Sequence, residues 1–254
     1  MELGSIIGLP LGIGMVLAGM LIEGGKLQSI MGISPFMIVI GGALGATLLD
    51  TPFQAAMQGL KMLALCFKGG HHHPEALVEQ IVKLAGIARK DGLLALEKER
   101  EAIEDPLLKE ALKFAIDGLE PNLVSAILES RTSFRSHAAQ AAAKFWATFA
   151  GYCPTVGILG AVLGLINVMQ HLDNPSEIGP GIATAFIATV YGVGFSNLVF
   201  MPVGNKLKAL VGHEEHYFEM VRVGVKDIQQ GTSPSIIASH LMAIIDQEPK
   251  EEGA

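Results

Sequence analysis

The sequence predicts an all-α, polytopic membrane protein with four transmembrane helices and helical cytoplasmic parts. Only 17% of its 254 residues are charged, whereas a soluble domain carries about 25%. The mean hydropathy is +0.44. Four stretches contain no Asp, Glu, Lys or Arg, namely residues 3–22, 27–49, 145–170 and 178–205. A helix of roughly 20 residues crosses the hydrocarbon core of a bilayer, so each stretch is long enough to span it.

The first two stretches predict a transmembrane hairpin near the N-terminus. Residues 3–22 lack a basic segment in front of them, and a second apolar stretch follows after a short turn. We therefore interpret them as a retained helix and not as a cleaved signal peptide. The second helix is expected to start near Ser34 and Pro35, because proline is tolerated in the first turn of a helix.

The polar part of the chain also has helical periodicity and no strand-type alternation. A helix is predicted from Pro74 to about Glu104, and another over 107–119. A helix that starts at Pro121 should run without a loop into the third span. The predicted domains are 1–50, a transmembrane hairpin; 51–144, a cytoplasmic helical domain; 145–205, a second transmembrane hairpin; 206–246, cytoplasmic helices; and 247–254, a disordered tail.

The positions of the basic residues predict the topology. Of the 18 Lys and Arg residues, 12 lie in 50–144 and five lie in 206–254. The positive-inside rule places both segments in the cytoplasm. With four crossings, both termini of this multi-pass protein are then cytoplasmic.

Composition and motifs exclude several classes of function. The net charge of −7 argues against a nucleic-acid binder, and two cysteines exclude a disulfide framework. No phosphate loop, nucleophile elbow or HExxH motif is present, so we expect no enzyme and no cofactor. The run His71-His72-His73 is interpreted as a polar turn and not as a metal site, because adjacent histidines do not share one helix face.

The third and fourth spans carry hydroxyl and amide side chains but no carboxylate and no basic residue. Such hydroxyls either bond to a carbonyl one turn back or line a hydrated path. An ion path normally needs an ionisable group, so this group would have to come from another polypeptide. Glycines four residues apart (Gly4/Gly8/Gly12, Gly41/Gly45 and Gly160/Gly164) predict close helix packing, either within one subunit or between subunits.

Three segments carry a resemblance to a known family. They are residues 150–166, with Pro154 followed by spaced glycines; residues 188–207, with Thr189, Tyr191-Gly192 and Pro202; and residues 89–97. Together they resemble the flagellar motor stator A subunits, the MotA/PomA group of the MotA–TolQ–ExbB proton-channel family. The alternative is a proton-channel subunit that energises outer-membrane transport (ExbB/TolQ-like). Those relatives have a single span before the cytoplasmic domain, so the two-span hairpin favours the stator.

The resemblance implies an assembly and its partners. Five copies would form a ring around a dimer of a B subunit (MotB-like), which supplies the ion-carrying aspartate. Ion flow would turn the ring, and the cytoplasmic domain would push a switch-complex protein of the rotor (FliG-like). A third hypothesis is a purely structural membrane scaffold, which Thr189→Val would distinguish from a channel.

The resemblance also implies roles for single residues. Pro154, Thr155 and Thr189 would lie at the ion path, and Pro154 and Pro202 would couple ion flow to movement. Arg89 and Glu97 would contact the rotor. Eight positions on one helix amount to about 80° of rotation, so the two charges would face one side.

Ala161 and Ala188 bear on the coupling ion. Sodium-driven relatives carry threonine at both positions. A dehydrated sodium ion needs oxygen ligands, and a methyl group supplies none. The two alanines therefore predict a proton as the coupling ion rather than sodium.

Overall fold

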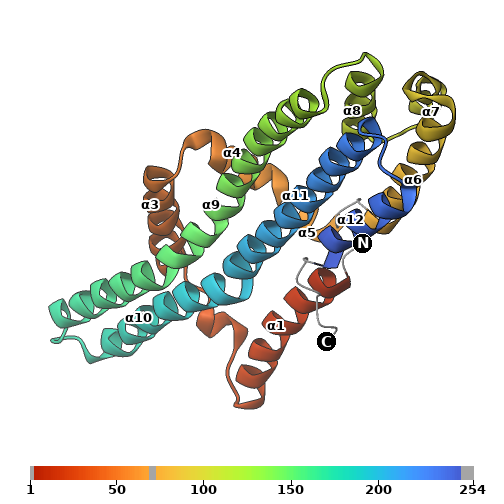
Figure 1. Ribbon diagram of the computed structural model, residues 1–254. Coiled ribbons are helices and arrows are strands. Elements are labelled where there is room, and N and C mark those ends of the chain that lie inside the picture. Colours follow the sequence, from red (N-terminus) through yellow and green to blue (C-terminus); the bar gives the residue numbers. More distant parts are fainter. Residues whose placement is uncertain (1–2, 69–72, 247–254) are drawn as a thin grey trace. The chain divides into compact units, whose positions relative to one another are not determined.

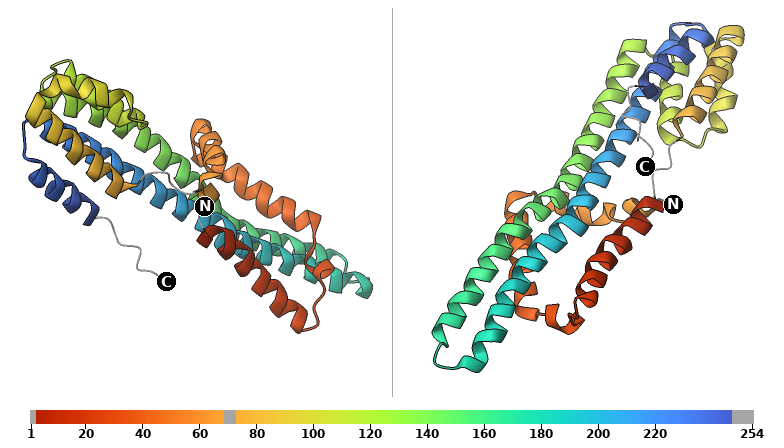
Figure 2. Two further views of the ribbon diagram at one scale, coloured as in Figure 1. Left: turned by 90° about the vertical axis from the view of Figure 1, so that its right-hand side faces the viewer. Right: turned by 90° about the horizontal axis from the view of Figure 1, so that it is seen from below.

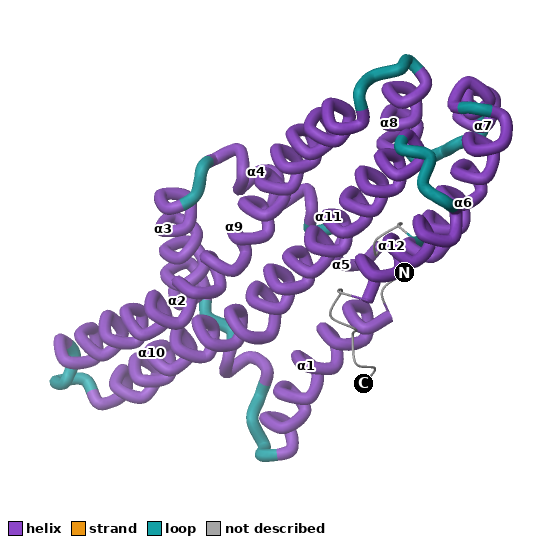
Figure 3. Tube along the Cα trace, in the orientation of Figure 1, coloured by secondary structure: helices purple, strands orange, loops and turns teal. Residues whose placement is uncertain are grey.

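All regular structure in the described part of the chain is helical. The computed structural model describes residues 3–68 and 73–246 (Figure 1), and Figure 3 shows helices joined by short loops throughout these ranges. The predicted all-α class is confirmed. The tail predicted at 247–254 lies outside the described residues, as do His71 and His72.

Within the described residues, four helices are long and apolar enough to cross a membrane, as predicted. The first is α1 (Leu3–Ile22), and the second comprises α2 (Ile33–Phe36), the π-helix η2 (Met37–Gly41) and α3 (Gly42–Asp50). The third lies in α9 (Pro121–Gln170), and the fourth comprises α10 (Pro175–Phe195), the π-helix η4 (Ser196–Phe200) and the start of α11 (Met201–Gln229). Helix α9 runs into its span without a loop, as predicted.

The remaining helices are shorter: α4 (Phe53–Met62), α5 (Leu65–Lys68), α6 (Pro74–Asp91), the 3-10 turn η3 (Leu93–Ala95), α7 (Leu96–Glu101), α8 (Pro106–Ile116) and α12 (Pro234–Asp246). The prediction of a single helix from Pro74 to about Glu104 was wrong. Helix α6 ends at Asp91 because Gly92 has φ +86°, in the left-handed region that favours glycine at helix ends.

The described residues form two compact units. One comprises residues 3–68 and 138–209, and the other comprises 73–137 and 210–246. The domain boundaries that we predicted follow charge, whereas these units follow packing. Helices α4 and α5 therefore group with the spans, although the charge pattern placed 51–144 in the cytoplasmic domain.

The second unit has a conventional apolar core. Amphipathic faces of its helices bury side chains such as Leu84, Leu112, Val221 and Ile237 completely. Beside this core, at the start of α8, Asp105 accepts two hydrogen bonds. One carboxylate oxygen of Asp105 accepts the backbone N–H of Leu108 at 2.7 Å and caps the helix. The other accepts the Tyr217 hydroxyl at 3.0 Å.

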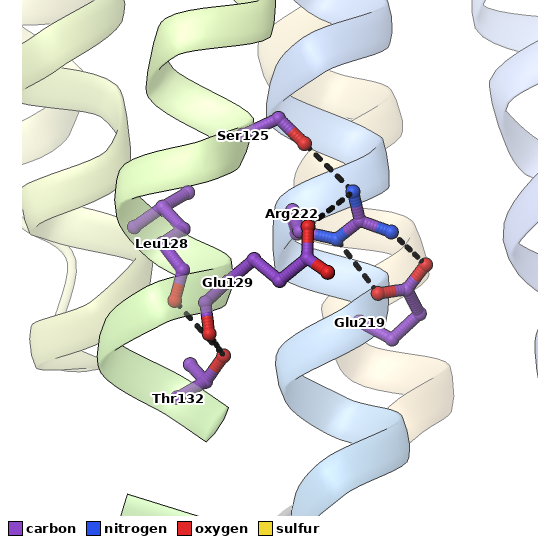
Figure 4. A network of polar contacts seen from close by, with 6 residues as sticks. All are labelled: Ser125, Leu128, Glu129, Thr132, Glu219 and Arg222. Carbon is purple, nitrogen blue, oxygen red and sulfur yellow. Dashed lines mark hydrogen bonds and ion pairs between the residues drawn. The ribbon is translucent and has the colours of Figure 1, made fainter. Parts of the chain in front are cut away.

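Arg222 on α11 joins α11 to α9 in the same unit (Figure 4). Its guanidinium donates to both carboxylate oxygens of Glu219 and, at 2.7 Å, to the hydroxyl of Ser125. Glu129 lies 3.9 Å away. The bonds to Glu219 raise the pKa of Arg222, which therefore remains charged. Ser125 is buried, so its hydroxyl depends on this partner.

Arg222→Leu is expected to lower the free energy of unfolding by about 2 kcal/mol, because hydrogen bonds to a charged group are lost and a buried hydroxyl is left unpaired. Thermal unfolding of the full-length chain measures the change. Arg131→Leu is the matched control. Arg131 is 59% exposed and pairs with Glu110, so its loss should cost about 0–1 kcal/mol. Equal losses for the two variants would contradict the prediction.

Candidate functional site

The membrane parts of α9 and α10 lie side by side (Figure 2), and their backbones approach each other closely at several glycines. A Cβ atom on Gly157 would lie 3.0 Å from the Ala188 carbonyl oxygen, and one on Gly164 would lie 2.9 Å from the Ala185 Cβ. Small residues at helical spacing permit this approach. The predicted packing of Gly160 and Gly164 is therefore within one chain. Gly4, Gly8, Gly41 and Gly45 instead meet nothing within 4 Å.

Pro154 lies inside α9, where the backbone of α9 closely approaches Gly192 of α10. A Cβ atom on Gly192 would lie 2.6 Å from the Cys153 carbonyl oxygen and 3.3 Å from the Cα of Pro154. Proline has no backbone N–H, so the carbonyl of Ala150 lacks its helical donor. The hydroxyl of Ser196 donates to this carbonyl at 2.8 Å.

The two threonines predicted at the ion path differ in their bonding. Thr155 is exposed, and its hydroxyl donates to the Tyr152 carbonyl at 2.9 Å, within its own helix. Thr189 is half-buried on α10, and its hydroxyl has no hydrogen-bond partner in the described part of the chain. Thr189 therefore keeps both its donor and its acceptor available.

The two alanines predicted to bear on ion choice also differ. Ala188 is buried, and a Cβ atom on Gly160 would lie 2.9 Å from the Ala188 Cβ. It therefore packs α10 on α9, a role that the sequence analysis missed. Ala161 is half-buried on α9.

Pro202 lies in the first turn of α11, directly after the π-helix η4. It is exposed, and it lines an open groove of about 480 Å³ together with Gly8 of α1 and Asn197 of η4. Like Pro154 in α9, Pro202 has no backbone N–H to donate to a carbonyl of the preceding turn. The fourth span thus has a π-helix and a proline in succession, at the level where coupling was predicted.

Sequence reasoning missed two anchors around this hairpin. The Tyr191 hydroxyl donates to the Ile30 carbonyl at 2.7 Å and accepts the Gly32 N–H at 3.1 Å, which ties α10 to the turn before α2. The indole N–H of Trp146 donates to the Gly59 carbonyl at 2.9 Å. Both anchors depend on tertiary contacts, although an aromatic side chain with one polar tip in a span is a usable signal.

Arg89 and Glu97 lie on different helices, α6 and α7, so the argument from rotation along one helix does not apply. Both side chains are exposed, and neither has an ion-pair or hydrogen-bond partner among the described residues. Nearby charges do pair: Lys83 contacts Glu99 at 2.9 Å. Arg89 and Glu97 are thus available to another molecule.

The comparisons with known proteins agree with this geometry. Residues 99–220 match the model of the MotA/TolQ/ExbB proton channel family, and residues 6–92 match that of the Motility protein A N-terminal region. The Motility protein A of Helicobacter pylori (strain ATCC 700392 / 26695) is 32% identical over 252 residues, which is 99% of this chain and 98% of the relative. The chain belongs to the MotA/TolQ/ExbB proton channel family.

Solved structures of family members have the same fold. The C. jejuni MotAB structure matches with a TM-score of 0.91 and 31% identity over 98% of both chains. The MotAB stator complex from Bacillus subtilis matches with a TM-score of 0.86 and 30% identity, over 94% of this chain and 95% of that one. The protein is therefore a multi-pass stator subunit of the motility protein A type. Membership of this proton channel family also confirms that it is not an enzyme.

Among the residues that the structure describes, no group of three or more His, Cys, Asp or Glu side chains could hold a metal ion. Two of the three residues of the histidine run, His71 and His72, lie outside those residues. His73 is exposed and directly precedes α6.

Proposed function

We propose that this stator subunit, together with a B subunit, conducts protons down their electrochemical gradient and converts the flow into torque on the flagellar rotor. One observation carries the proposal. The α9–α10 hairpin packs closely and presents a free hydroxyl at Thr189, yet residues 145–170 and 178–205 contain no carboxylate and no basic side chain. An intramembrane relay needs an ionisable group, so a partner must supply it.

The partner is a B subunit of the kind present in the MotAB complexes to which this chain is similar. Its transmembrane aspartate would carry the proton. The assembly is a homo-oligomer, a pentamer around a B dimer, in the bacterial inner membrane. The excess of Lys and Arg in 50–144 and 206–254 supports a cytoplasmic location of both termini.

Each site residue then has a proposed task. Thr189 passes the proton along the path. Thr155 takes part in this transfer when its hydroxyl releases the Tyr152 carbonyl. Pro154 keeps α9 deformable beside the aspartate, and Pro202 passes the movement of the fourth span to the cytoplasmic helices. Arg89 and Glu97 contact a switch-complex protein of the rotor.

Deletion of the gene in its source organism tests the proposal. We expect flagellated but paralysed cells, rescued by the native gene and not by Pro154→Leu. Any paralogous stator set must be deleted as well, because it would mask the defect. Normal swimming combined with impaired import across the outer membrane would move the protein to the transport branch of its family.

Thr189→Val is expected to lower proton flow about tenfold with assembly intact, the size of one lost hydrogen bond to a charged group. Proton uptake by cells that express the A and B subunits measures the flow. The control is Thr184→Val on the same helix, whose hydroxyl already bonds to the Pro180 carbonyl at 2.9 Å. A protein that serves only as a scaffold would show equal flow in both variants.

Swimming speed is expected to follow external pH and not sodium. The side chains of Ala161 and Ala188 offer no oxygen to a dehydrated sodium ion, and the Ala188 side chain is buried against Gly160. Tracking of cells in buffers of varied sodium at fixed pH measures the dependence. A speed that rises with sodium at fixed pH would overturn the assignment of the coupling ion.

A further inference from the structure

The helix of the third span lacks one of its backbone hydrogen bonds. Pro154 removes the N–H that would bond to the Ala150 carbonyl. Ala150 is completely buried, so the carbonyl is closed off by packing. A buried acceptor without a donor lowers stability, more so in a membrane where no water reaches the helix.

Ser196 of the fourth span supplies the missing donor. Its hydroxyl lies 2.8 Å from the Ala150 carbonyl oxygen, and the serine is 3% exposed. This behaviour differs from that of neighbouring polar residues. Thr184 and Asn197 both donate to carbonyls four residues back in their own helices, the usual pattern in a span.

The position of Ser196 makes the bond more than a local repair. Ser196 is the first residue of the π-helix η4, and Phe200 is the last. The Phe200 ring stacks on Phe149, the residue before Ala150, with the ring centroids 4.3 Å apart. Both ends of η4 therefore hold adjacent residues of α9, one turn before Pro154.

We propose that Ser196 is a positioning residue that links the deformable point at Pro154 to the π-helix of the fourth span. A change in the bend of α9 at Pro154 moves the Ala150 carbonyl. Either the Ser196 bond breaks or η4 moves with the carbonyl, and Pro202 follows η4 by two residues. This inference rests on the proposed function for its role in coupling, whereas the hydrogen bond itself can be tested without it.

The first experiment is a double-mutant cycle on the full-length chain purified from its native membrane. Ser196→Ala removes the donor, and Pro154→Ala returns an N–H to the Ala150 carbonyl. We expect Ser196→Ala to lower the midpoint of thermal unfolding by about 3 °C or more when Pro154 is present, and to have little effect when residue 154 is alanine. Equal shifts in both backgrounds would overturn the proposal, because a hydroxyl that only fills space costs the same in each.

The second experiment measures torque for each stator assembled at the motor. Ser196→Ala should lower it about fivefold or more at normal stator numbers, and Ser196→Thr, which keeps the hydroxyl, should restore most of it. Thr184→Ala is the matched control and should keep native torque. Native torque in Ser196→Ala would overturn the coupling role.

Two further outcomes remain decisive. If Ser196→Ala fails to assemble, recovery of assembly in the Pro154→Ala/Ser196→Ala double variant supports the link, and failure to recover contradicts it. If the native chain itself generates no rotation while the double-mutant cycle behaves as expected, the proposed function fails and the hydrogen-bond link stands.

Discussion

Gly192→Ala is expected to abolish rotation and to lower the free energy of unfolding by about 1–3 kcal/mol. The added Cβ atom would lie 2.6 Å from the Cys153 carbonyl oxygen and 3.0 Å from the Cα of Gly157. Both neighbours are backbone atoms of α9, so no side-chain rotation relieves the contact. The helices must separate at Pro154, where the proton path and its coupling are proposed. Swimming assays and thermal unfolding of the purified chain measure the two effects.

Gly194→Ala is the matched control for this substitution. Gly194 lies two residues further along the same helix, and a Cβ atom there meets nothing within 4 Å. Alanine is also the better helix former, so this variant should fold and swim like the native protein. Native rotation in Gly192→Ala, or an equal defect in Gly194→Ala, would show that close packing against Cys153 and Pro154 is not required.

A larger side chain at the same position sharpens the test. Gly192→Val adds two methyl groups to an already prohibited Cβ atom, and its effect on stability should exceed that of alanine. Reduced backbone freedom alone would not produce a defect in Gly192→Ala, because Gly192 lies in regular helix, where alanine is the better helix former. A graded loss from glycine to alanine to valine therefore identifies steric overlap.

The sequence was sufficient for the architecture because membrane helices leave a strong signal. The absence of charge over 20 or more residues located all four spans, and Pro121 marked the start of the 50-residue helix α9. The break after Asp91 was missed because the apolar pattern continues across Gly92. Only the backbone conformation, with φ +86°, shows that the helix stops there.

The site was harder to predict, because its decisive contacts join distant parts of the chain. Pro154 and Thr189 stand out as residue types, but the Ser196 hydroxyl looks like any other hydroxyl in a span. Its partner at Ala150 is 46 residues away, and nothing local specifies that pairing. Likewise, Ala188 was predicted to bear on ion choice, whereas its contact with Gly160 requires two helices to be in place.

Arg89→Glu is expected to leave cells flagellated, with assembled stators that produce little or no torque. Arg89 is exposed and has no partner among the described residues, so folding should not depend on it. An interface with a charged rotor surface would depend on it strongly, because like charges placed opposite each other cost several kcal/mol in binding and slow the encounter. Rotation of tethered cells and counts of labelled stators at the motor measure torque and assembly separately.

Lys113→Glu provides the control for net charge. Lys113 is exposed near the end of α8. Its replacement by Glu changes the net charge by the same amount as Arg89→Glu, outside the proposed rotor contact. This variant should rotate like the native protein. Comparable paralysis in both variants would mean that the overall charge of the helices outside the spans matters, and that Arg89 has no particular role.

A charge swap separates an internal ion pair from a contact with the rotor. Arg89 and Glu97 form no ion pair with each other, and they lie on α6 and α7 respectively. Arg89→Glu combined with Glu97→Arg should therefore remain defective, because each reversed charge still meets the wrong partner. A compensating reversal on the rotor protein should restore torque. Full rescue by the swap alone would instead place the two charges in one internal pair and would contradict the proposed contact.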